Sequence, residues 1–322
     1  MIEIDRLRGG DRRALARAIT LLESNKPEDE EQASELLKTL LPHSGNSIRI
    51  GLTGVPGVGK STLIEVLGST LTEKGHKVAV LAVDPSSSIS GGSILGDKTR
   101  MESLSSNENA FIRPSPAGKT LGGVARRTRE AIVLCEAAGY DVIIVETVGV
   151  GQSETLVSEM TDMFLLMLLP GGGDELQGIK RGIMELADLV VVNKADDDMK
   201  SRATLSAGDI QQALRLIKRR HENWQVPVVT ASARDGQNIS NIWEHIENFW
   251  KVLSESGEIN SGRQKQARDW LWYESREMLL TALRSDQRVH DEISDLEKQV
   301  EEGKLPPTSA ARFLVQQFLN NN

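Results

Sequence analysis

The sequence contains a single cysteine, Cys135, in 322 residues. One thiol cannot form a disulfide within the chain, and this scarcity suits a protein kept in a reducing compartment. The residues just before it, 131–134, are apolar and resemble the buried face of a helix. We therefore expect Cys135 to be a small core residue rather than a reactive thiol.

Long apolar runs and an excess of positive charge are also missing. The longest apolar run, Met163 to Leu169, is the length of a strand and far below the roughly 20 residues of a membrane span. The first residues lack the apolar segment of a secretory signal, so we expect a cytoplasmic protein with no membrane partner. With 38 Lys and Arg against 46 Asp and Glu, the net charge is −8, which argues against nucleic acid as a general partner.

The order of apolar patterns predicts an α/β fold with a mostly parallel sheet covered by helices on both faces, and the glycine-rich motif described next makes this fold one of the P-loop NTPase type. We predict an N-terminal helical extension over 1–46, a central α/β domain over 47–254 that carries the motifs described below, and a C-terminal helical arm over 255–322. Predicted strands cover 47–53, 77–83, 141–146, 163–169, 189–193 and 226–230. Predicted helices cover 4–22, 28–41, 60–74, 122–138, 176–187, 205–221, 239–253, 263–283, 286–300 and 309–319.

A phosphate-binding loop follows the first predicted strand. The residues match G-x4-G-K-[ST] between an apolar strand and a helix, the context that this motif requires. Glycines let backbone N–H groups point at phosphate oxygens, the lysine balances the β- and γ-phosphates, and the serine hydroxyl holds Mg²⁺. The adjoining Thr62 is expected at the α-phosphate. The loop consists of Gly54, Val55, Pro56, Gly57, Val58, Gly59, Lys60 and Ser61.

A carboxylate for the same magnesium ion is predicted at Glu146, where four apolar residues of a strand end. Gly149 follows three residues later, which is the DxxG arrangement of GTPases with Glu in place of Asp. The Gly149 N–H is expected to sense the γ-phosphate. An acid at the end of a strand is often an ordinary polar residue, but its pairing with a phosphate-binding loop favours the functional interpretation.

Asp84 ends another apolar strand and opens a segment rich in serine and glycine that continues to Arg100. Such a segment can order around a γ-phosphate, so we interpret 84–100 as a nucleotide-sensing switch. Asp84 and Asp97 are candidates for contact with the metal or its waters. The alternative for each is an aspartate that stabilises a turn.

A base-recognition motif, Asn193-Lys194-Ala195-Asp196, follows the apolar strand 189–192. Guanine presents two adjacent donor groups that one carboxylate, Asp196, can accept, whereas adenine lacks that pair. Asn193 is expected to support the loop and reach the base, with the Lys194 stem over the base plane. Ser232, Ala233 and Arg234, after the next strand, fit the loop whose backbone N–H meets guanine O6. Together these motifs predict a GTPase that binds GTP or GDP with Mg²⁺.

One part of many GTPases is missing, because Val150 rather than glutamine follows the glycine of the DxxG motif, and Gln152 comes two residues later. A glutamine at that position orients the attacking water. We therefore expect slow hydrolysis that a partner accelerates.

These motifs together resemble the MeaB/ArgK group in the G3E class of P-loop GTPases, which includes the methylmalonic aciduria type A protein. The resemblance covers essentially the whole chain. The segments that carry it are 54–62, 83–101, 142–154, 175–188 and 191–196.

The resemblance implies a chaperone that uses GTP hydrolysis to gate adenosylcobalamin loading and to protect or reactivate a cobalamin-dependent acyl-CoA mutase, chiefly methylmalonyl-CoA mutase. It also implies a homodimer with C-terminal helices at the interface. It assigns Asp84, Asp97 and Glu146 to the magnesium site. It assigns Lys180, in the stretch 177–181, to a further switch that couples nucleotide state to the mutase; the alternative for Lys180 and Arg181 is a solvated helix face.

Three rival functions remain. A metallocentre-assembly GTPase of the same class would need clustered soft ligands, but the five histidines are scattered and there is one cysteine. A transport-associated (LAO/AO-type) kinase would need a protein-substrate site, and no motif supplies one. A nucleotide-binding scaffold that never hydrolyses is the third alternative, and the complete set of predicted magnesium ligands favours hydrolysis over it.

Overall fold

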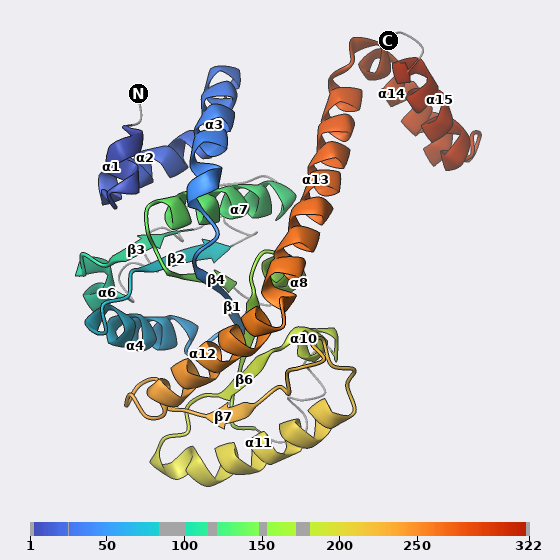
Figure 1. Ribbon diagram of the computed structural model, residues 1–322. Helices are drawn as coiled ribbons and strands as arrows, with labels where there is room; N and C mark the ends of the chain where they lie inside the picture. The colour runs from blue at the N-terminus through green and yellow to red at the C-terminus, as the bar shows by residue number, and fades with distance from the viewer. Residues whose placement is uncertain are drawn as a thin grey trace. The chain divides into compact units, whose positions relative to one another are not determined.

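A seven-stranded sheet organises the chain in the computed structural model, and its strands run in the order β3-β2-β4-β1-β5-β6-β7 (Figure 1). Every neighbouring pair is parallel, which confirms the predicted sheet. The structure describes residues 3–24, 26–83, 101–114, 121–147, 153–171 and 181–319. The strands are β1 Ile48–Gly54, β2 Val78–Val83, β3 Ala110–Arg113, β4 Val142–Thr147, β5 Met163–Leu168, β6 Leu189–Val192 and β7 Val228–Thr230.

Helices precede, connect and follow these strands, as expected when parallel strands require crossover connections. They are α1 Ile4–Arg8, α2 Arg12–Leu22, α3 Pro27–Leu40, α4 Lys60–Glu73, α6 Glu102–Ser106, α7 Leu121–Ala137, α8 Ser153–Ser158, α10 Arg181–Leu186, α11 Lys200–Arg215, α12 Ile239–Glu255, α13 Glu258–Ser285, α14 Gln287–Glu301 and α15 Pro307–Leu319. Short 3-10 turns cover Leu41–His43 and Asp197–Met199.

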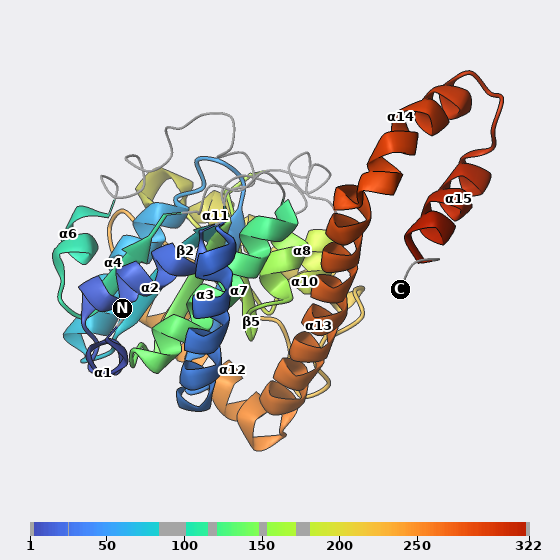
Figure 2. The ribbon, with the colours of Figure 1, turned by 90° about the horizontal axis from the view of Figure 1, so that it is seen from above.

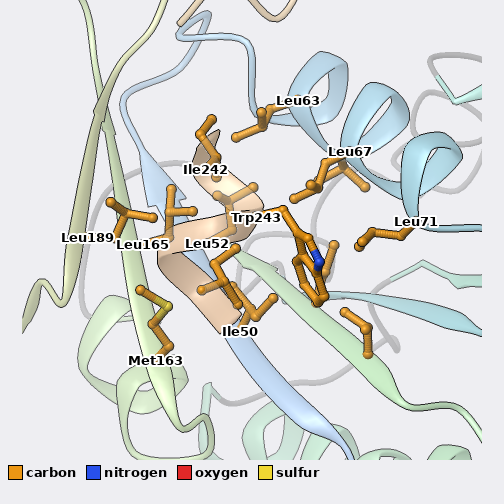
Figure 3. Close-up of a cluster of buried hydrophobic side chains, with 14 of the residues drawn as sticks. Ile50, Leu52, Leu63, Leu67, Leu71, Met163, Leu165, Leu189, Ile242 and Trp243 are labelled. Carbon is orange, nitrogen blue, oxygen red and sulfur yellow. The ribbon is translucent and has the colours of Figure 1, made fainter. Parts of the chain in front are cut away.

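One face of the sheet packs against α4 and α12. Alternate residues of the central strands, such as Ile50 and Leu52 of β1, point into this layer and are buried. Figure 3 shows Trp243 of α12 among side chains from α4 and the strands, and its side chain is 2 % exposed. This layer holds β1 and α4 in place, and the phosphate-binding loop lies between them.

The opposite face is covered in two parts. Over β2 and β4, α7 and α8 contribute to an apolar cluster that includes Cys135, which is fully buried as predicted. Burial raises the pKa of the Cys135 thiol, so the thiol stays protonated. Over β5, β6 and β7, α10 and α11 form a separate cluster.

The N-terminal helices pack on this second face, beside α7 (Figure 2). Leu15, Ile19 and Leu40 are almost completely buried in the same cluster as α7. Asp11 caps α2 by accepting hydrogen bonds from the backbone N–H groups of Arg13 and Ala14. Pro27 occupies the first turn of α3, as its fixed φ favours.

The chain divides into two compact units, 1–260 and 261–322. In the second unit, α14 and α15 pack on each other, and Val289 and Ala310 are its buried apolar residues. The three-part division into 1–46, 47–254 and 255–322 remains a prediction. Among the described residues, no helix is long and apolar enough to cross a membrane.

Several predicted boundaries are wrong. The polar stretch after residue 254 does not separate two helices widely, because only Ser256 and Gly257 lie between α12 and α13. Gly257 has φ +77°, a left-handed conformation that ends a helix within one residue. Helix α11 begins at Lys200 and ends at Arg215, whereas the apolar pattern predicted 205–221.

The early end of α11 has a structural cause, because Arg220 and His221 leave the helical path and contact the buried Asp188. The sequence patterns did not predict three elements, namely β3, α6 and α8. Each has only four to six residues, too few for a periodic pattern to be recognised.

Candidate functional site

The loop between β1 and α4 has a backbone that only glycine allows at several positions. Gly57 and Gly59 have φ of +79° and +98°, in the left-handed region. A Cβ on Gly54 would come within 2.6 Å of the Met167 carbonyl oxygen, and one on Gly59 within 2.6 Å of Asn193 Nδ2. The glycines of the motif therefore permit both the turn itself and its close approach to β5 and to Asn193.

Lys60 begins α4 and is 8 % exposed. Its ammonium donates a hydrogen bond to the Gly54 carbonyl oxygen at 2.8 Å, across the loop. Burial lowers the pKa of Lys60, and the negative charges of Glu146 and Glu154 oppose that change. The loop thus encloses a cation whose charge interacts with two carboxylates, and α4 begins at the same residue.

The predicted magnesium ligands Ser61 and Glu146 lie together. Ser61 Oγ is 3.5 Å from Glu146 Oε1, although 85 residues separate them in the chain. Their approach follows from the pairing of β1 with β4, which sets Leu52 beside Glu146, and from the hydrogen bond of 2.8 Å between the hydroxyls of Thr53 and Thr147. Hydroxyl and carboxylate oxygens are the donors that Mg²⁺ prefers, so these residues fit that ion.

Asn193 joins the phosphate-binding loop to the end of β7. Its Nδ2 donates to the Val58 carbonyl oxygen at 2.7 Å, and its Oδ1 accepts from the Ala233 backbone N–H at 3.0 Å. The side chain is 2 % exposed. One buried amide therefore fixes the position of two loops that are far apart in the sequence.

Asp196 lies beside the loop after β7. Its Oδ1 accepts a hydrogen bond from the Ser232 hydroxyl, and its Oδ2 is 3.4 Å from an Arg234 guanidinium nitrogen. The backbone N–H of Ala195 donates to the Ala231 carbonyl oxygen at 3.0 Å, which aligns the two loops. Lys194 adopts φ +59° and is exposed. The structure thus brings together all the predicted base-site residues.

Sequence reasoning missed two features of this site. It assigned Ser232 a role only through the backbone of its loop, whereas the Ser232 hydroxyl contacts Asp196 directly. It did not single out Glu154, which is 1 % exposed in the first turn of α8 and whose charge acts on Lys60. Glu154 ends the segment 142–154 that carries the family resemblance, but no motif gave it a role of its own, so its effect on Lys60 was found only in the folded structure.

Several predicted residues fall outside the described part of the chain. These are Asp84, Asp97, Gly149, Val150, Gln152 and Lys180. Thr62 is described and lies exposed in the first turn of α4. Within the described ranges, no group of three or more His, Cys, Asp or Glu side chains could hold a metal ion.

Phosphate-binding and base-recognition loops meet at one edge of the sheet. The phosphate-binding loop follows the carboxyl end of β1, with Glu146 at the end of β4 beside it, and the base-recognition loops follow β6 and β7. From β1 the chain continues to β2, and from β4 it continues to β5, on the opposite side of the central pair β4–β1 in the strand order. Ligands of open α/β sheets bind at the carboxyl ends of the strands where the strand order reverses in this way. This edge can therefore hold a nucleotide between a cationic loop and a carboxylate.

Comparisons with known proteins agree with this geometry. The family described as "Methylmalonyl Co-A mutase-associated GTPase MeaB" matches residues 15–288. A probable GTPase of Mycobacterium tuberculosis is 54% identical over 310 residues, covering 96% of this chain and 92% of the relative. The mitochondrial methylmalonic aciduria type A homolog of Mus musculus is 48% identical, covering 96% and 77%.

A solved structure gives the same result for the fold. The crystal structure of a protein described as an LAO/AO transport system kinase superposes with a TM-score of 0.79 at 40% identity, covering 97% of this chain and 95% of that one.

Proposed function

Because the chain belongs to the MeaB family and is a GTPase, we propose that it is a chaperone that uses GTP hydrolysis to maintain a cobalamin-dependent acyl-CoA mutase, chiefly methylmalonyl-CoA mutase. In this role it gates adenosylcobalamin loading and protects or reactivates the mutase. The proposed setting is the cytoplasm.

The observation that carries the nucleotide part is the double hydrogen bond of Asn193, which holds the phosphate-binding loop against the loop that contacts Asp196. A purine nucleotide that spans the two loops places its phosphates at Lys60 and its base at Asp196. The Asp196 carboxylate satisfies two adjacent donors on guanine, whereas with adenine it would be desolvated without them.

Hydrolysis converts GTP and water to GDP and phosphate. The water oxygen forms a bond to the γ-phosphorus while the bond to the bridging oxygen breaks, and negative charge spreads over the phosphoryl oxygens. The ammonium of Lys60, inside the loop, balances that charge. Ser61 and Glu146 would hold Mg²⁺, with Asp84 and Asp97 as further proposed ligands; when bound, the ion supplies additional positive charge to the phosphates.

Support for the mutase as client comes from the description of the family, which names an association with methylmalonyl-CoA mutase, and from the similarity to the methylmalonic aciduria type A homolog. The sequence contains no DxHxxG motif for cobalamin, so we assign the cobalamin to the mutase. Lys180 and the stretch 177–181 are proposed to couple the nucleotide state to that partner.

We also propose that the protein is a homodimer that uses its C-terminal helices. On α13, Leu271, Trp272, Met278 and Leu279 recur at spacings of seven residues, which places them along one stripe of the helix. Their exposed fractions are 63%, 70%, 67% and 62%. Burying such side chains contributes about 1.5–3 kcal/mol each, so a second copy of this stripe is a favourable partner for it.

The proposal is tested by measuring phosphate release from GTP and from ATP with Mg²⁺, with and without purified methylmalonyl-CoA mutase. We expect turnover that prefers GTP and rises when the mutase is added. A GTP preference without any response would retain the GTPase and remove methylmalonyl-CoA mutase as the client. Equal turnover of ATP would refute the role assigned to Asp196.

The base site is tested in the same assay with Asp196→Ala. Loss of the charge-assisted hydrogen bonds to guanine is expected to lower kcat/KM for GTP about 10- to 100-fold, with little change for ATP. Asp209→Ala is the matched control, because it removes the same charge from an exposed position on α11, away from the base-recognition loops. The control is expected to keep the GTP preference.

A further inference from the structure

A pocket of about 120 Å3 lies between α10 and the end of α11. Its apolar floor belongs to, or packs against, the cluster that α10 and α11 form over β5, β6 and β7. The floor consists of Met184, Ala187, Leu214, Ile217 and Val226. Gln211 closes one side by donating a hydrogen bond to the Val226 carbonyl oxygen at 3.3 Å.

This pocket is separate from the nucleotide site. Helix α11 begins just after the base-recognition motif and runs for 16 residues, so its two ends are about 24 Å apart. The pocket lies at its far end, close to where α10 leads into β6. A ligand there would not contact Lys60 or Asp196.

Positive charge is concentrated on the rim of the pocket. Residues 215–220 read Arg-Leu-Ile-Lys-Arg-Arg, in a chain whose net charge is −8. All four cations of this stretch line the pocket, and Glu185 is the acidic residue that lines it with them.

Only one of these four cations has an evident structural role. Arg220 is 3.1 Å from the buried Asp188 and donates to the carbonyl oxygens of Leu186 and Ser158, each at 3.3 Å. These contacts tie the segment after α11 to the end of α10. Burial raises the pKa of Asp188, whereas Arg220 and His221 act to lower it.

The other three cations, Arg215, Lys218 and Arg219, are exposed and form no ion pair among the described residues. Arg215 lies in the last turn of α11, where the helix dipole favours a cation, but Lys218 and Arg219 lie beyond the helix. Like charges this close repel one another, so an anionic partner would relieve the repulsion.

The shape and polarity of the pocket indicate the kind of anion. Compact phosphate sites use backbone N–H groups at helix N-termini, whereas this pocket lies at the carbonyl end of α11. Three long, mobile cationic side chains fit several carboxylates spread over a surface, and the apolar floor fits an aliphatic side chain. We infer that this pocket is a docking site for an acidic segment of a partner protein that also carries leucine-like side chains.

The inference goes beyond the proposed mutase role and does not depend on it. It is tested by fluorescence anisotropy with a short labelled peptide in which glutamate alternates with leucine, added to the full-length protein. We expect saturable binding that weakens as salt is added, because exposed charges are screened over about 10 Å at 0.1 M ionic strength. A peptide with serine in place of leucine is expected to bind more weakly, since it cannot use the apolar floor.

The pocket variant is R215A/K218A/R219A, and it is expected to weaken binding of the glutamate–leucine peptide roughly tenfold, as three exposed charge contacts would. The control variant R13A/R17A/K74A removes three exposed cations from other elements, so both variants have the same net charge. The control is expected to keep peptide binding, and both are expected to keep GTP turnover, which reports an intact fold.

Three outcomes would overturn the inference. They are equal peptide binding by the wild type and the pocket variant, an equal loss in the control variant, and equal binding of the serine peptide. If the pocket variant fails to fold, the single change Lys218→Glu replaces it, because Lys218 is exposed and outside any helix. Peptide binding that survives Lys218→Glu unchanged would also count against a site here.

Discussion

Asn193 supports the binding site although its side chain is almost inaccessible to solvent. Its amide is almost completely buried, and both its donor and its acceptor are used, by Val58 and Ala233. The two partners are backbone groups of different loops. An aspartate here would keep the acceptor and place a carboxylate oxygen against the Val58 carbonyl, so the amide is specifically required.

Replacing Asn193 by alanine is expected to weaken GTP binding more than tenfold, as measured by calorimetry. The change leaves a buried carbonyl and a buried N–H without partners, at a cost of about 1–3 kcal/mol each. Asn238→Gly is a suitable control, because it removes another amide hydrogen bond, to Thr230, and preserves the left-handed backbone at φ +61°. Unchanged affinity in Asn193→Ala would show that the two loops hold their positions by other means.

A second residue-scale feature is the ion pair between Arg49 of β1 and Glu136 of α7. Arg49 Nε and Nη2 donate to the two carboxylate oxygens of Glu136, each at 2.8 Å. The Ser47 hydroxyl and the Gly45 backbone N–H also donate hydrogen bonds to the Glu136 carboxylate. Burial by itself would raise the pKa of Glu136, but these hydrogen bonds and the Arg49 charge together hold it below the ordinary 4.5.

We expect Glu136→Gln to lower the free energy of unfolding by about 3–5 kcal/mol near pH 7, because it leaves a largely buried guanidinium without its counter-charge. A carboxylate whose pKa is lower in the folded state stabilises the fold at pH values above its pKa in the unfolded chain. That stabilisation is lost as the pH falls through its pKa in the folded state. The difference between wild type and variant should therefore be full above pH 4.5 and shrink below it. Urea unfolding at several pH values measures it, and a difference that does not change with pH would contradict the assignment.

At the scale of elements, β1 and α8 approach each other at Gly51. A Cβ at this position would lie 2.8 Å from both Thr161 Oγ1 and Val157 Cγ1, and 3.0 Å from Phe164 Cδ2. The strand runs directly into the phosphate-binding loop, so a shift of β1 at this position would also displace that loop.

Gly51→Ala is expected to destabilise the protein by about 1–3 kcal/mol, because three packed neighbours must move to admit one methyl group. Gly208→Ala in α11 is the matched change, since nothing lies within 4 Å of its added Cβ. That control should raise stability by about 0.5–1 kcal/mol through helix propensity. Thermal unfolding distinguishes the two variants. Equal stability of both would mean that α8 can move to admit the added methyl group without a measurable loss of stability.

At the scale of the whole molecule, the division at residue 260 predicts that nucleotide binding and dimerisation can be separated. A chain that ends at Asn260 keeps every described residue of the nucleotide site, and it lacks the apolar stripe of α13. We expect it to hydrolyse GTP and to be a monomer by analytical ultracentrifugation, and we expect the full chain to sediment as a dimer.

The full-length variant Trp272→Ser/Leu279→Ser provides the comparison for this truncation. It changes two exposed side chains of the stripe and leaves the rest of the chain intact. Weaker self-association in this variant would assign the contact to the stripe. A dimer that survives both changes would place the interface elsewhere.

Much of this protein could be predicted from its sequence. The glycine positions of the loop at Gly54 to Gly59, the strand-ending Glu146 and the Asn193–Asp196 motif act through local backbone geometry and residue type, so short stretches of sequence reveal them. Long apolar strands such as β4 and β5 were predicted to within one residue at each end. Periodic patterns of this length leave few alternatives.

Only the tertiary structure decided which of these parts meet. The Asn193 contact to Val58 spans 135 residues of sequence, and the Ser61 contact to Glu146 spans 85. The effect of Glu154 on Lys60, and the pocket where four cations line an apolar floor formed between α10 and α11, likewise depend on elements that come together only in the fold. Sequence determines the local conformation and chemistry of each segment, but contacts between distant segments depend on the strand order and on which face of the sheet each helix covers, and no local pattern encodes either.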